Sequence, residues 1–368
     1  MIKKVGFLTS SRADYGISVP LINALKSDTR FDLTIIAFGM HLEKEHGNTV
    51  KEIYKDKSLK VEEVEYMPNG NQPIDISYGQ GKVLCKFSKF WKKNKFDLVI
   101  AIGDRFEMFA AVQASVPFEV KLVHIHGGET SLGSIDNIYR DQISIASSIH
   151  LTSNVLHSEK VQKIIGSKKN IYNIGSLSLY ELKTLNLPNW DDVCQKFSII
   201  NAPFVLVTFH PETINAENNY GYVKLLKSLL SEISSEINLV ITSSNADTYG
   251  NLYNDMMIDL SIKKRKNIFL VNSFGKLNYF SALKSCKLVL GNSSSGLIEA
   301  ASFKKYTLNI GNRQLGRVRN NNVIDVKFDK SEILENFNKI LKNSTYEGEN
   351  IYSSRVKLEE IINILYEF

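Results

Sequence analysis

The chain has 368 residues, of which 43% are hydrophobic and 23% are charged. This composition excludes a disordered or fibrous protein and predicts a globular one. At roughly 100–200 residues per domain, the length predicts two domains, each able to bury its own core. The formal net charge is +6 and the lysines are scattered in short groups, so we expect solvated helix ends and no nucleic-acid partner.

Three cysteines, Cys85, Cys194 and Cys286, lie far apart and form no CxxC pair. That spacing argues against a disulfide scaffold or a zinc knuckle and is typical of a reducing cytoplasm. The first residues, MIKKVGFLTSS, hold only a short apolar stretch, so we read no signal peptide. No apolar run approaches the ~20 residues of a membrane span. We therefore expect a cytoplasmic protein without a membrane partner.

Short β-branched runs recur along the whole chain and predict strands. In the first half they cover 5–9, 32–38, 97–103, 120–125, 149–153 and 171–175. In the second half they cover 204–210, 237–244, 267–272, 287–293, 306–311 and 322–326. These runs are continuously apolar, and such runs are typical of strands buried on both faces of a parallel sheet.

The segments between the runs have helical periodicity, for example in YGISVPLINALKSD and YVKLLKSLLSEI. A stretch with two of the seven prolines, 182–203, interrupts the alternation. The predicted fold class is therefore α/β, with two Rossmann-like doubly wound parallel-sheet domains facing a central cleft. We place the N-terminal domain at 1–180 and the C-terminal domain at 181–350. Residues 351–368 form a closing helix that could cross back to the first domain.

Polar clusters follow most of the predicted strands. They are SSRADYG (10–16), GDRFE (103–107), HGGE (126–129), FHPET (209–213), SSNAD (243–247), GNSSSG (291–296) and GNRQLGR (311–317). Ligands of doubly wound sheets bind beyond the carboxyl ends of the strands. Seven such clusters on two domains indicate one shared cleft.

The stretch HIHGGE (124–129) admits two kinds of chemistry. His124 and His126 would lie on one strand face, which allows a metal site, but no HExxH motif or further Cys/His cluster supplies more ligands. Glu129 joins Asp104 and Asp136 to give three carboxylates at neighbouring strand ends, which can divide acid and base roles. The alternative for Asp104 is a helix N-cap, with Glu107 completing a capping box.

Other clusters have features that suit a phosphate. In GNSSSGLIEA, small residues open a helix after a strand, although ordinary N-cap serines are an alternative. Arg12 suits a diphosphate, and Arg313 with Arg317 is either a phosphate-binding pair or a solvated one. His210 follows a buried strand, where a structural hydrogen bond is the common role. The GxGxxG spacing of dinucleotide sites is absent.

Nine motifs occur in order along residues 10–317. They are SSRADYG, GMHL, GDRFEM, HIHGGE, GSIDNIYR, FHPET, NADTYG, GNSSSGLIEA and NIGNRQLGR. In this combination the chain resembles the hydrolysing UDP-N-acetylglucosamine 2-epimerases of bacterial sialic- and legionaminic-acid-type pathways, over nearly its whole length. One departure is Ser10-Ser11, where that family usually has Gly-Thr. The resemblance implies the GT-B fold, a UDP-sugar substrate, no metal or other cofactor, and a homo-oligomer, either a dimer or a tetramer.

The resemblance also implies residue roles. Acid–base work would fall on Asp104, Glu129 and Asp136. The UDP-sugar would be held by Arg12, His210, Asn245, Ser293, Ser294, Ser295, Glu299 and Arg313. In HIHGGE, this makes Glu129 a catalytic carboxylate and His126 a residue that orients it, while His124 packs in the strand and none of the three binds metal.

The implied reaction converts UDP-N-acetylglucosamine and water to N-acetylmannosamine and UDP. It proceeds by elimination to a 2-acetamidoglucal and hydration with inversion at C2. The alternative substrate is UDP-N,N'-diacetylbacillosamine, used for legionaminic acid, and the sequence does not separate the two. A glycosyltransferase on this fold would need an acceptor and no group of carboxylates around C2. An inactive nucleotide-sugar sensor would bind without releasing UDP.

Overall fold

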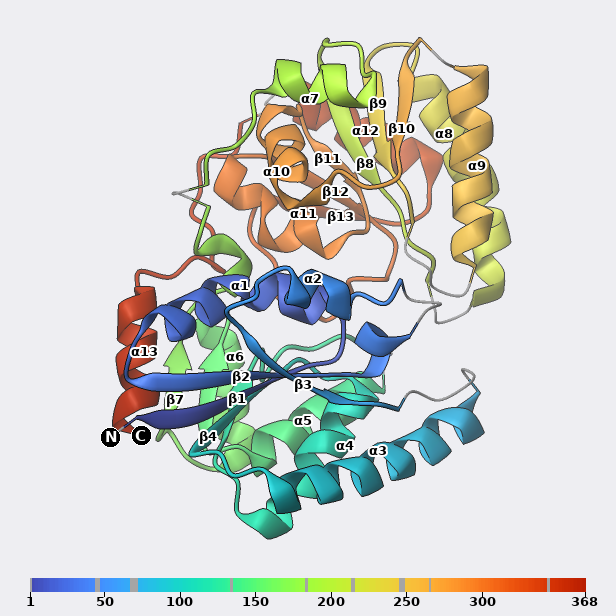
Figure 1. The fold of residues 1–368 in the computed structure, drawn as a ribbon. Coiled ribbons are helices and arrows are strands. Elements are labelled where there is room, and N and C mark those ends of the chain that lie inside the picture. The colour runs from blue at the N-terminus through green and yellow to red at the C-terminus, as the bar shows by residue number, and fades with distance from the viewer. Residues whose placement is uncertain are drawn as a thin grey trace. The chain divides into compact units, whose positions relative to one another are not determined.

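The computed structural model describes residues 2–43, 47–66, 72–132, 135–182, 185–212, 216–244, 249–264, 266–342 and 345–368. The chain divides into two compact units (Figure 1). Unit 1 is Met1–Glu181 together with Tyr352–Phe368, and unit 2 is Leu182–Ile351. Each unit has its own parallel sheet with helices on both faces, so the predicted α/β class is confirmed. Among the helices of these described residues, none is long and apolar enough to cross a membrane.

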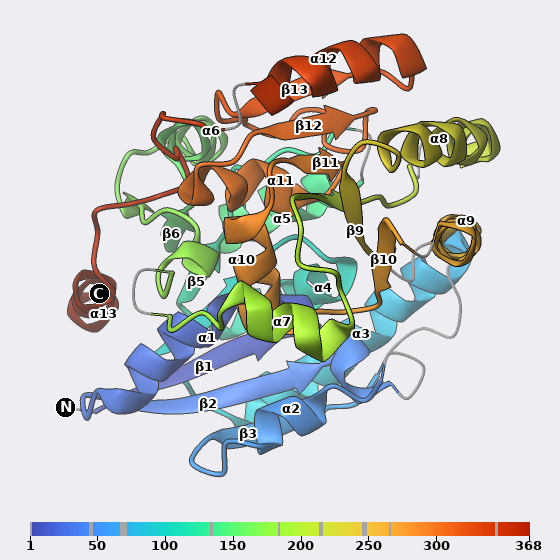
Figure 2. The same cartoon turned by 90° about the horizontal axis from the view of Figure 1, so that it is seen from above.

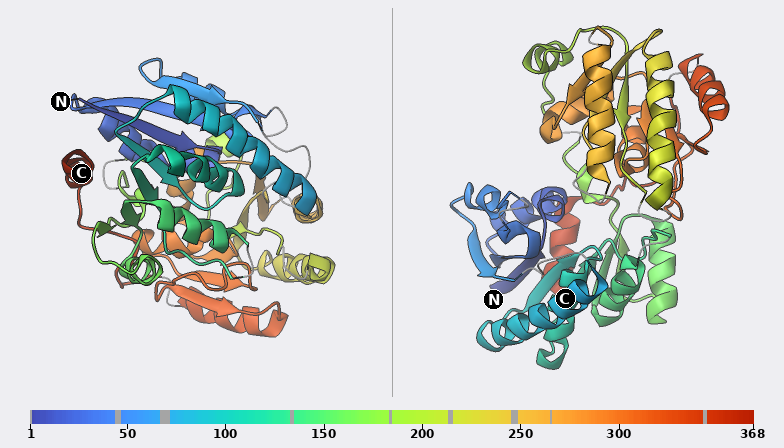
Figure 3. Two further views of the ribbon diagram at one scale, coloured as in Figure 1. Left: turned by 90° about the horizontal axis from the view of Figure 1, so that it is seen from below. Right: turned by 90° about the vertical axis from the view of Figure 1, so that its right-hand side faces the viewer.

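Unit 1 contains a parallel sheet of seven strands in the order β3-β2-β1-β4-β5-β6-β7. Its strands are β1 (Lys3–Thr9), β2 (Phe31–Phe38), β3 (Lys60–Val64), β4 (Leu98–Ile102), β5 (Leu122–Ile125), β6 (Ile149–Thr152) and β7 (Ile171–Asn173). Its helices are α1 (Arg12–Ser27), α2 (Val50–Tyr54), α3 (Pro73–Lys93), α4 (Phe106–Ser115), α5 (Asp136–Ala146), α6 (Val155–Ile165) and α13 (Leu358–Glu367). Helices α3 to α6 pack in sequence along the sheet, as the left view of Figure 3 shows for α3, α4 and α5.

Unit 2 contains a six-stranded parallel sheet in the order β10-β9-β8-β11-β12-β13. Its strands are β8 (Phe204–Thr208), β9 (Asn238–Thr242), β10 (Ile268–Val271), β11 (Val289–Gly291), β12 (Thr307–Ile310) and β13 (Val323–Val326). Its helices are α7 (Trp190–Phe197), α8 (Asn219–Ile233), α9 (Gly250–Lys263), α10 (Gly275–Ser285), α11 (Ser294–Ile298) and α12 (Lys330–Lys342). Helices α8 and α9 lie side by side, and α7 packs against α10 (Figure 2).

The burial of the strands explains their apolar sequences. Every residue of β4, β5 and β8 is buried, because side chains on both faces of these central strands are covered by helices. In β8, Val205 and Val207 join one core cluster while Phe204 and Leu206 join another. Each run predicted as a strand corresponds to one of these strands.

Strand β3 is the one that the sequence pattern missed. It is the edge strand of the unit 1 sheet, and its sequence, KVEEV, is mostly exposed. An edge strand with glutamates is well suited to water, because charge discourages pairing with another chain. Apolar continuity, which identified the central strands, is therefore absent from this one.

Helix α13 belongs to unit 1 although it ends the sequence. Ile361, Ile362 and Leu365 lie in the unit 1 core, and α13 packs against α1. The Arg30 guanidinium lies over the Tyr366 ring, 4.8 Å from the ring centroid. The unit 1 fold is thus completed by a segment that follows all of unit 2 in the chain.

Candidate active site

The strand order identifies where each unit offers a ligand site. In unit 1 the order reverses between β1 and β4, and in unit 2 between β8 and β11. Doubly wound sheets bind ligands beyond the carboxyl ends of the strands at such a reversal. The motifs SSRADYG and GDRFE follow β1 and β4, and FHPET and GNSSSG follow β8 and β11. The predicted motifs therefore stand at the reversal point of their own sheet.

Arg140 brings two of the three predicted carboxylates together. Its side chain, on α5, is 4% exposed and forms an ion pair with Asp104, which follows β4. Its second terminal nitrogen, Nη1, donates to the Glu129 backbone carbonyl at 2.9 Å. Asp104 and the Glu129 loop are therefore fixed to one buried guanidinium. Arg140 lies in the GSIDNIYR motif, but the motif alone does not predict this role.

Asp136 is the first residue of α5, one turn before Arg140, and its charge interacts with that of Arg105. Burial alone would lower the pKa of the Arg105 guanidinium, but the charges of Glu107, Asp14 and Asp136 raise it above its usual value. The alternative of an Asp104 N-cap is wrong, because the N-cap position of α4 is Arg105, whose side chain makes no capping hydrogen bond and pairs with Glu107 instead. Carboxylates therefore surround Arg105 and Arg140.

The first motif, SSRADYG, contributes a further carboxylate. Ser11 is the N-cap of α1, and its side chain accepts from the Asp14 backbone N–H. The Ser10 hydroxyl donates to Asp14 Oδ2 at 3.0 Å. Burial raises the pKa of Asp14, although these two hydroxyls and the charge of Arg105 oppose that effect. The two serines that depart from the family pattern thus hold Asp14, while Arg12 is exposed in the first turn of α1.

Glu129 is buried among hydrogen-bond donors. Its Oε1 lies 2.6 Å from His126 Nδ1 and 2.9 Å from the Ser153 hydroxyl, which donates to it. Ser153 Oγ in turn lies 2.9 Å from His157 Nδ1. Burial lowers the pKa of His157 to about 4, so its imidazole is neutral at pH 7. Nothing in the sequence pattern indicates Ser153 or His157, because the contact of Ser153 with Glu129 crosses from the β5 loop to the residues after β6, and His157 contacts Ser153 there.

The two glycines of HIHGGE make the turn that places Glu129. Gly128 has φ +81, and a Cβ atom there would lie 2.3 Å from the His157 carbonyl oxygen. Only glycine fits both conditions. The turn brings Glu129 back toward His126, three residues earlier. The next residue, Thr130, accepts a hydrogen bond at its Oγ1 from Lys160 Nζ at 2.9 Å.

His124 is a packing residue, as the sequence indicates. Its Nε2 faces the Gly103 carbonyl at 2.9 Å and its Nδ1 faces the Ser144 hydroxyl at 2.9 Å. A carbonyl can only accept, so the proton is on Nε2, and burial lowers the pKa of His124 to about 3. Within the part of the chain that the structure describes, no group of three or more His, Cys, Asp or Glu side chains could hold a metal ion.

In unit 2, Asn292 joins three of the predicted UDP-binding motifs. Its side chain accepts from the His210 backbone N–H at 2.8 Å and donates to the His210 carbonyl at 2.8 Å. Its own carbonyl accepts from Gln314 Nε2 at 2.7 Å and from Arg313 Nη1 at 3.3 Å. Burial and the charge of Arg313 lower the pKa of His210 to about 3. Asn292 lies inside GNSSSG, a motif in which only the serines were predicted to bind the UDP-sugar.

The serines of that motif start a short helix. Ser293 is the N-cap of α11, and its side chain accepts from the Ser295 backbone N–H. Glu299 is the C-cap of the same helix and is half-buried. Gly291 before them has φ +140, and a Cβ there would lie 1.9 Å from the Thr208 carbonyl oxygen, so β8 and β11 could not pair with any other residue at this position.

The structure therefore brings the predicted residues together in two groups. Asp104, Glu129 and Asp136 gather in unit 1, to which Arg12 also belongs. His210, the serines and Arg313 gather around Asn292 in unit 2. Asn245 lies outside the described residues.

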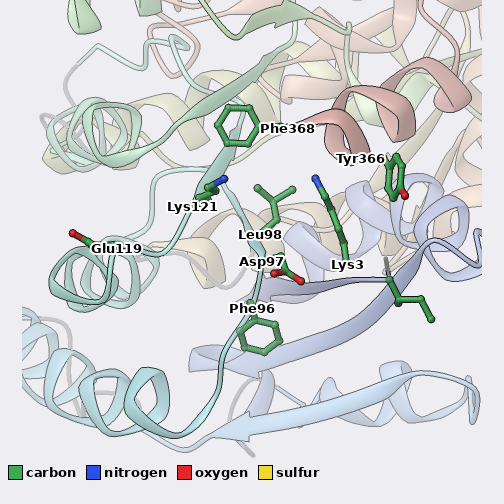
Figure 4. A pocket seen from close by; sticks show the side chains of 9 residues that line it. Lys3, Phe96, Asp97, Leu98, Glu119, Lys121, Tyr366 and Phe368 are labelled. Atoms are coloured by element: carbon green, nitrogen blue, oxygen red, sulfur yellow. The ribbon is translucent and has the colours of Figure 1, made fainter.

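A hollow of about 490 Å³ lies at the opposite edge of the unit 1 sheet (Figure 4). Its lining residues are Ile2, Lys3, Phe96, Asp97, Leu98, Glu119, Lys121, Tyr366 and Phe368. They stand near the amino ends of β1, β4 and β5 and on or just after α13. Because ligands of such sheets bind at the carboxyl ends, this hollow is not the candidate active site.

Comparison with known proteins identifies the family. The family described as UDP-N-acetylglucosamine 2-epimerase matches residues 23–366. The chain is 33% identical to the polysialic acid biosynthesis protein P7 of Escherichia coli, over 92% of this chain and 86% of that protein. It is 31% identical to the GDP/UDP-N,N'-diacetylbacillosamine 2-epimerase (hydrolyzing) of Campylobacter jejuni, over 88% of this chain and 84% of that protein.

A solved structure has the same fold. The Neisseria meningitidis UDP-GlcNAc 2-epimerase, crystallised with UDP-GlcNAc, superposes with a TM-score of 0.78 at 17% identity, covering 99% of this chain and 100% of that one. This likeness confirms the GT-B fold that the motifs implied. From the extent of the family match and the identity to these relatives, the chain belongs to the UDP-N-acetylglucosamine 2-epimerase family.

Proposed function

We propose that the protein is a hydrolysing UDP-sugar 2-epimerase, which converts UDP-N-acetylglucosamine and water to N-acetylmannosamine and UDP for the synthesis of a sialic-type acid. The observation that carries this proposal is the gathering of Asp104, Glu129 and Asp136 around two arginines at the carboxyl ends of β4 and β5. A family member that only bound a nucleotide sugar would have no use for three such carboxylates. The relatives from C. jejuni and Legionella pneumophila are both named as hydrolyzing 2-epimerases.

The chemistry explains why this group of residues is needed. The C2–H bond of a pyranoside is barely acidic, so a base can remove that proton only as the C1–O bond breaks and positive charge grows on the ring. We propose that the acid–base work falls on Asp104, Glu129 and Asp136. Elimination then gives a 2-acetamidoglucal. Water adds to its C1, and a proton adds to the face of C2 opposite to the one that lost it.

The leaving diphosphate must be stabilised while its bond to C1 breaks. We propose that Arg12, His210, Asn245, Ser293, Ser294, Ser295, Glu299 and Arg313 hold the UDP-sugar. Of these, Arg313 supplies a cation beside the Asn292 carbonyl, and the N-cap of α11 supplies hydroxyls and backbone N–H groups. Fixed donors aimed at a developing negative charge are the largest single contribution in many enzymes.

A second substrate has specific support. UDP-N,N'-diacetylbacillosamine is named in the relatives from C. jejuni, at 31% identity, and from L. pneumophila, at 27% identity. The E. coli relative, at 33% identity, is named for polysialic acid instead. We retain UDP-N-acetylglucosamine as the first proposal, with the diacetamido sugar, used for legionaminic acid, as the alternative.

One experiment in labelled water tests the reaction and the substrate together. Each UDP-sugar is incubated with the protein in deuterium oxide containing oxygen-18, and the products are analysed by NMR and mass spectrometry. We expect deuterium at C2 in the manno configuration and oxygen-18 at C1 of the free sugar. Retention of the original C2 hydrogen would refute elimination, and oxygen-18 in UDP would mean attack at phosphorus. The sugar with the higher kcat/KM is the substrate.

A further inference from the structure

His126 carries a polar atom that the fold leaves unsatisfied. Its side chain is 13% exposed, and its Nε2 atom is buried without a hydrogen-bond partner among the described residues. Leaving a buried donor or acceptor unpaired destabilises the folded protein. Native structures rarely contain such groups unless a ligand or a chemical role accounts for them.

The backbone of His126 is also strained. It has φ +69, in the left-handed region that side chains other than glycine seldom adopt. The His126 backbone N–H is held there by the Leu151 carbonyl at 3.1 Å, directly after β5. Residues in this backbone conformation are destabilising and cluster at active sites. Two unfavourable features thus meet in one residue, at the strand end where the carboxylates gather.

The hydrogen bonds around Glu129 decide which nitrogen of His126 carries the proton. The Ser153 hydroxyl has one proton and donates it to Glu129 Oε1, so it accepts from His157 Nδ1–H. Every contact thus directs a proton toward Oε1. His126 Nδ1, 2.6 Å from the same oxygen, must therefore donate as well. A neutral His126 then has its lone pair on Nε2.

This arrangement reverses the relation that the sequence suggested. Glu129 is held by Ser153 through its side chain and by Arg140 and Lys160 through its backbone carbonyl. A carboxylate fixed in this way selects the tautomer of a histidine and stabilises its protonated form, as in other carboxylate–histidine pairs. His126 is the member of the pair whose second nitrogen remains unpaired in the described structure.

We propose that His126 Nε2 is the base that removes the C2 proton of the UDP-sugar, and that Glu129 is its positioning residue. The inference rests on the proposed function and reassigns one of its groups. In the step, the Nε2 lone pair takes the C2 proton, and the C2–H electron pair becomes the C1–C2 double bond. The C1–O electron pair leaves with UDP. His126 later releases its proton to solvent.

The charges that face His126 suit this role. Protonation places a positive charge against the Glu129 carboxylate, which is the acidic neighbour at 2.6 Å. Arg140 and Lys160, which contact the Glu129 backbone, oppose the charge. His124 and His157 add no positive charge at pH 7, because burial lowers the pKa of each.

The test removes the imidazole and returns it from solution. His126→Gly suits the left-handed backbone and leaves an open space, whereas His126→Gln fills that space with a side chain that cannot act as a base. Turnover of the preferred UDP-sugar is measured for both variants with and without added imidazole, and UDP affinity is measured by calorimetry. We expect both to lose about 10²–10⁴-fold in kcat, the usual contribution of a general base, with UDP affinity unchanged. Imidazole should restore activity to His126→Gly alone, in proportion to its neutral form.

A matched variant separates the two members of the pair. Glu129→Gly is assayed with formate, which would replace a carboxylate base. If formate restores Glu129→Gly while imidazole fails to restore His126→Gly, Glu129 is the base and the inference is wrong. Full activity of His126→Gly without imidazole would also overturn it. Failure of the function itself is seen separately, because the unmodified protein would then release no UDP from either sugar, and the inference would fall with it.

Discussion

Asn292 should be the residue on which the proposed UDP-binding end of unit 2 depends most. Its amide forms two hydrogen bonds of 2.8 Å with the backbone of His210, and its carbonyl accepts from Gln314 and Arg313. The side chain is fully buried. Asn292→Ala would keep the carbonyl contacts and remove both bonds to His210, so the substitution tests the amide alone.

The expected loss can be worked out from these contacts. Two hydrogen bonds contribute about 1 kcal/mol each, and leaving the buried His210 N–H and C=O unpaired costs about 1–3 kcal/mol for each group that water does not reach. We expect the free energy of unfolding of unit 2 to fall by about 3 kcal/mol. Because His210 would no longer be held in a fixed position relative to Arg313, UDP affinity should fall at least about tenfold, which is about 1.4 kcal/mol.

Urea unfolding measures the free energy of unfolding, and calorimetry measures the affinity for UDP. Trp190, stacked on Phe204 at a centroid distance of 4.5 Å, reports on unit 2 when the other tryptophan is removed by Trp91→Phe. The matched control is Asn322→Ala, which removes a buried amide contact to the Lys305 carbonyl just before β13, at the opposite edge of the sheet. The control should lose stability but not UDP affinity. Unchanged UDP affinity in Asn292→Ala would refute the reasoning.

Four further outcomes are expected. The substitutions Asp104→Asn, Glu129→Gln and Asp136→Asn should each lower turnover by at least ~10²-fold with little change in UDP affinity; near-normal rates in all three would contradict the assignment. Calorimetry should show weaker UDP binding for Arg313→Ala, by ~1.5–3 kcal/mol, and for Ser294→Ala, by about half as much; unchanged affinity in both would remove these loops from the site. Stability should fall as pH drops from about 6.5 toward 3, because burial holds the pKa of His124 and His210 at about 3 in the folded protein and the unfolded chain binds those protons first; a flat pH profile of urea unfolding would contradict this. Activity should persist in excess EDTA; loss that one divalent metal restores would revive a metal site at the HxH pair.

Most of the fold could be predicted because its central strands are buried on both faces. That burial requires continuous apolar runs, which are visible in the sequence, as in LVIAI of β4 and FVLVT of β8. The edge strand β3 has no such requirement, so KVEEV gives no apolar signal. The start of α4 differs from the predicted one because a capping pattern uses only neighbouring residues. Glu107, which the pattern predicted to close a capping box with Asp104, forms an ion pair with Arg105 instead.

The candidate site was predictable where its residues stand at strand ends and unpredictable where they act across strands. Polar motifs identified the loops after β4, β5, β8 and β11. Arg140 carried a weak signal, one helical turn after Asp136 on α5. Ser153 carried none, because its contact with Glu129 spans 24 residues and depends on the pairing of β5 with β6.

The relation between His126 and Glu129 shows what only a structure can decide. Their spacing, with Gly128 in the left-handed turn between them, predicts that the two side chains can meet. It does not predict which one orients the other, because a histidine and a carboxylate can each play either part. The direction is set by a third group, the Ser153 hydroxyl, whose single proton goes to Glu129 and thereby makes Oε1 an acceptor. His126 must then hold its own proton on Nδ1, which leaves the basic nitrogen on the side away from Glu129. A serine that no motif marks therefore decides which residue of a recognisable motif is placed to act as the base.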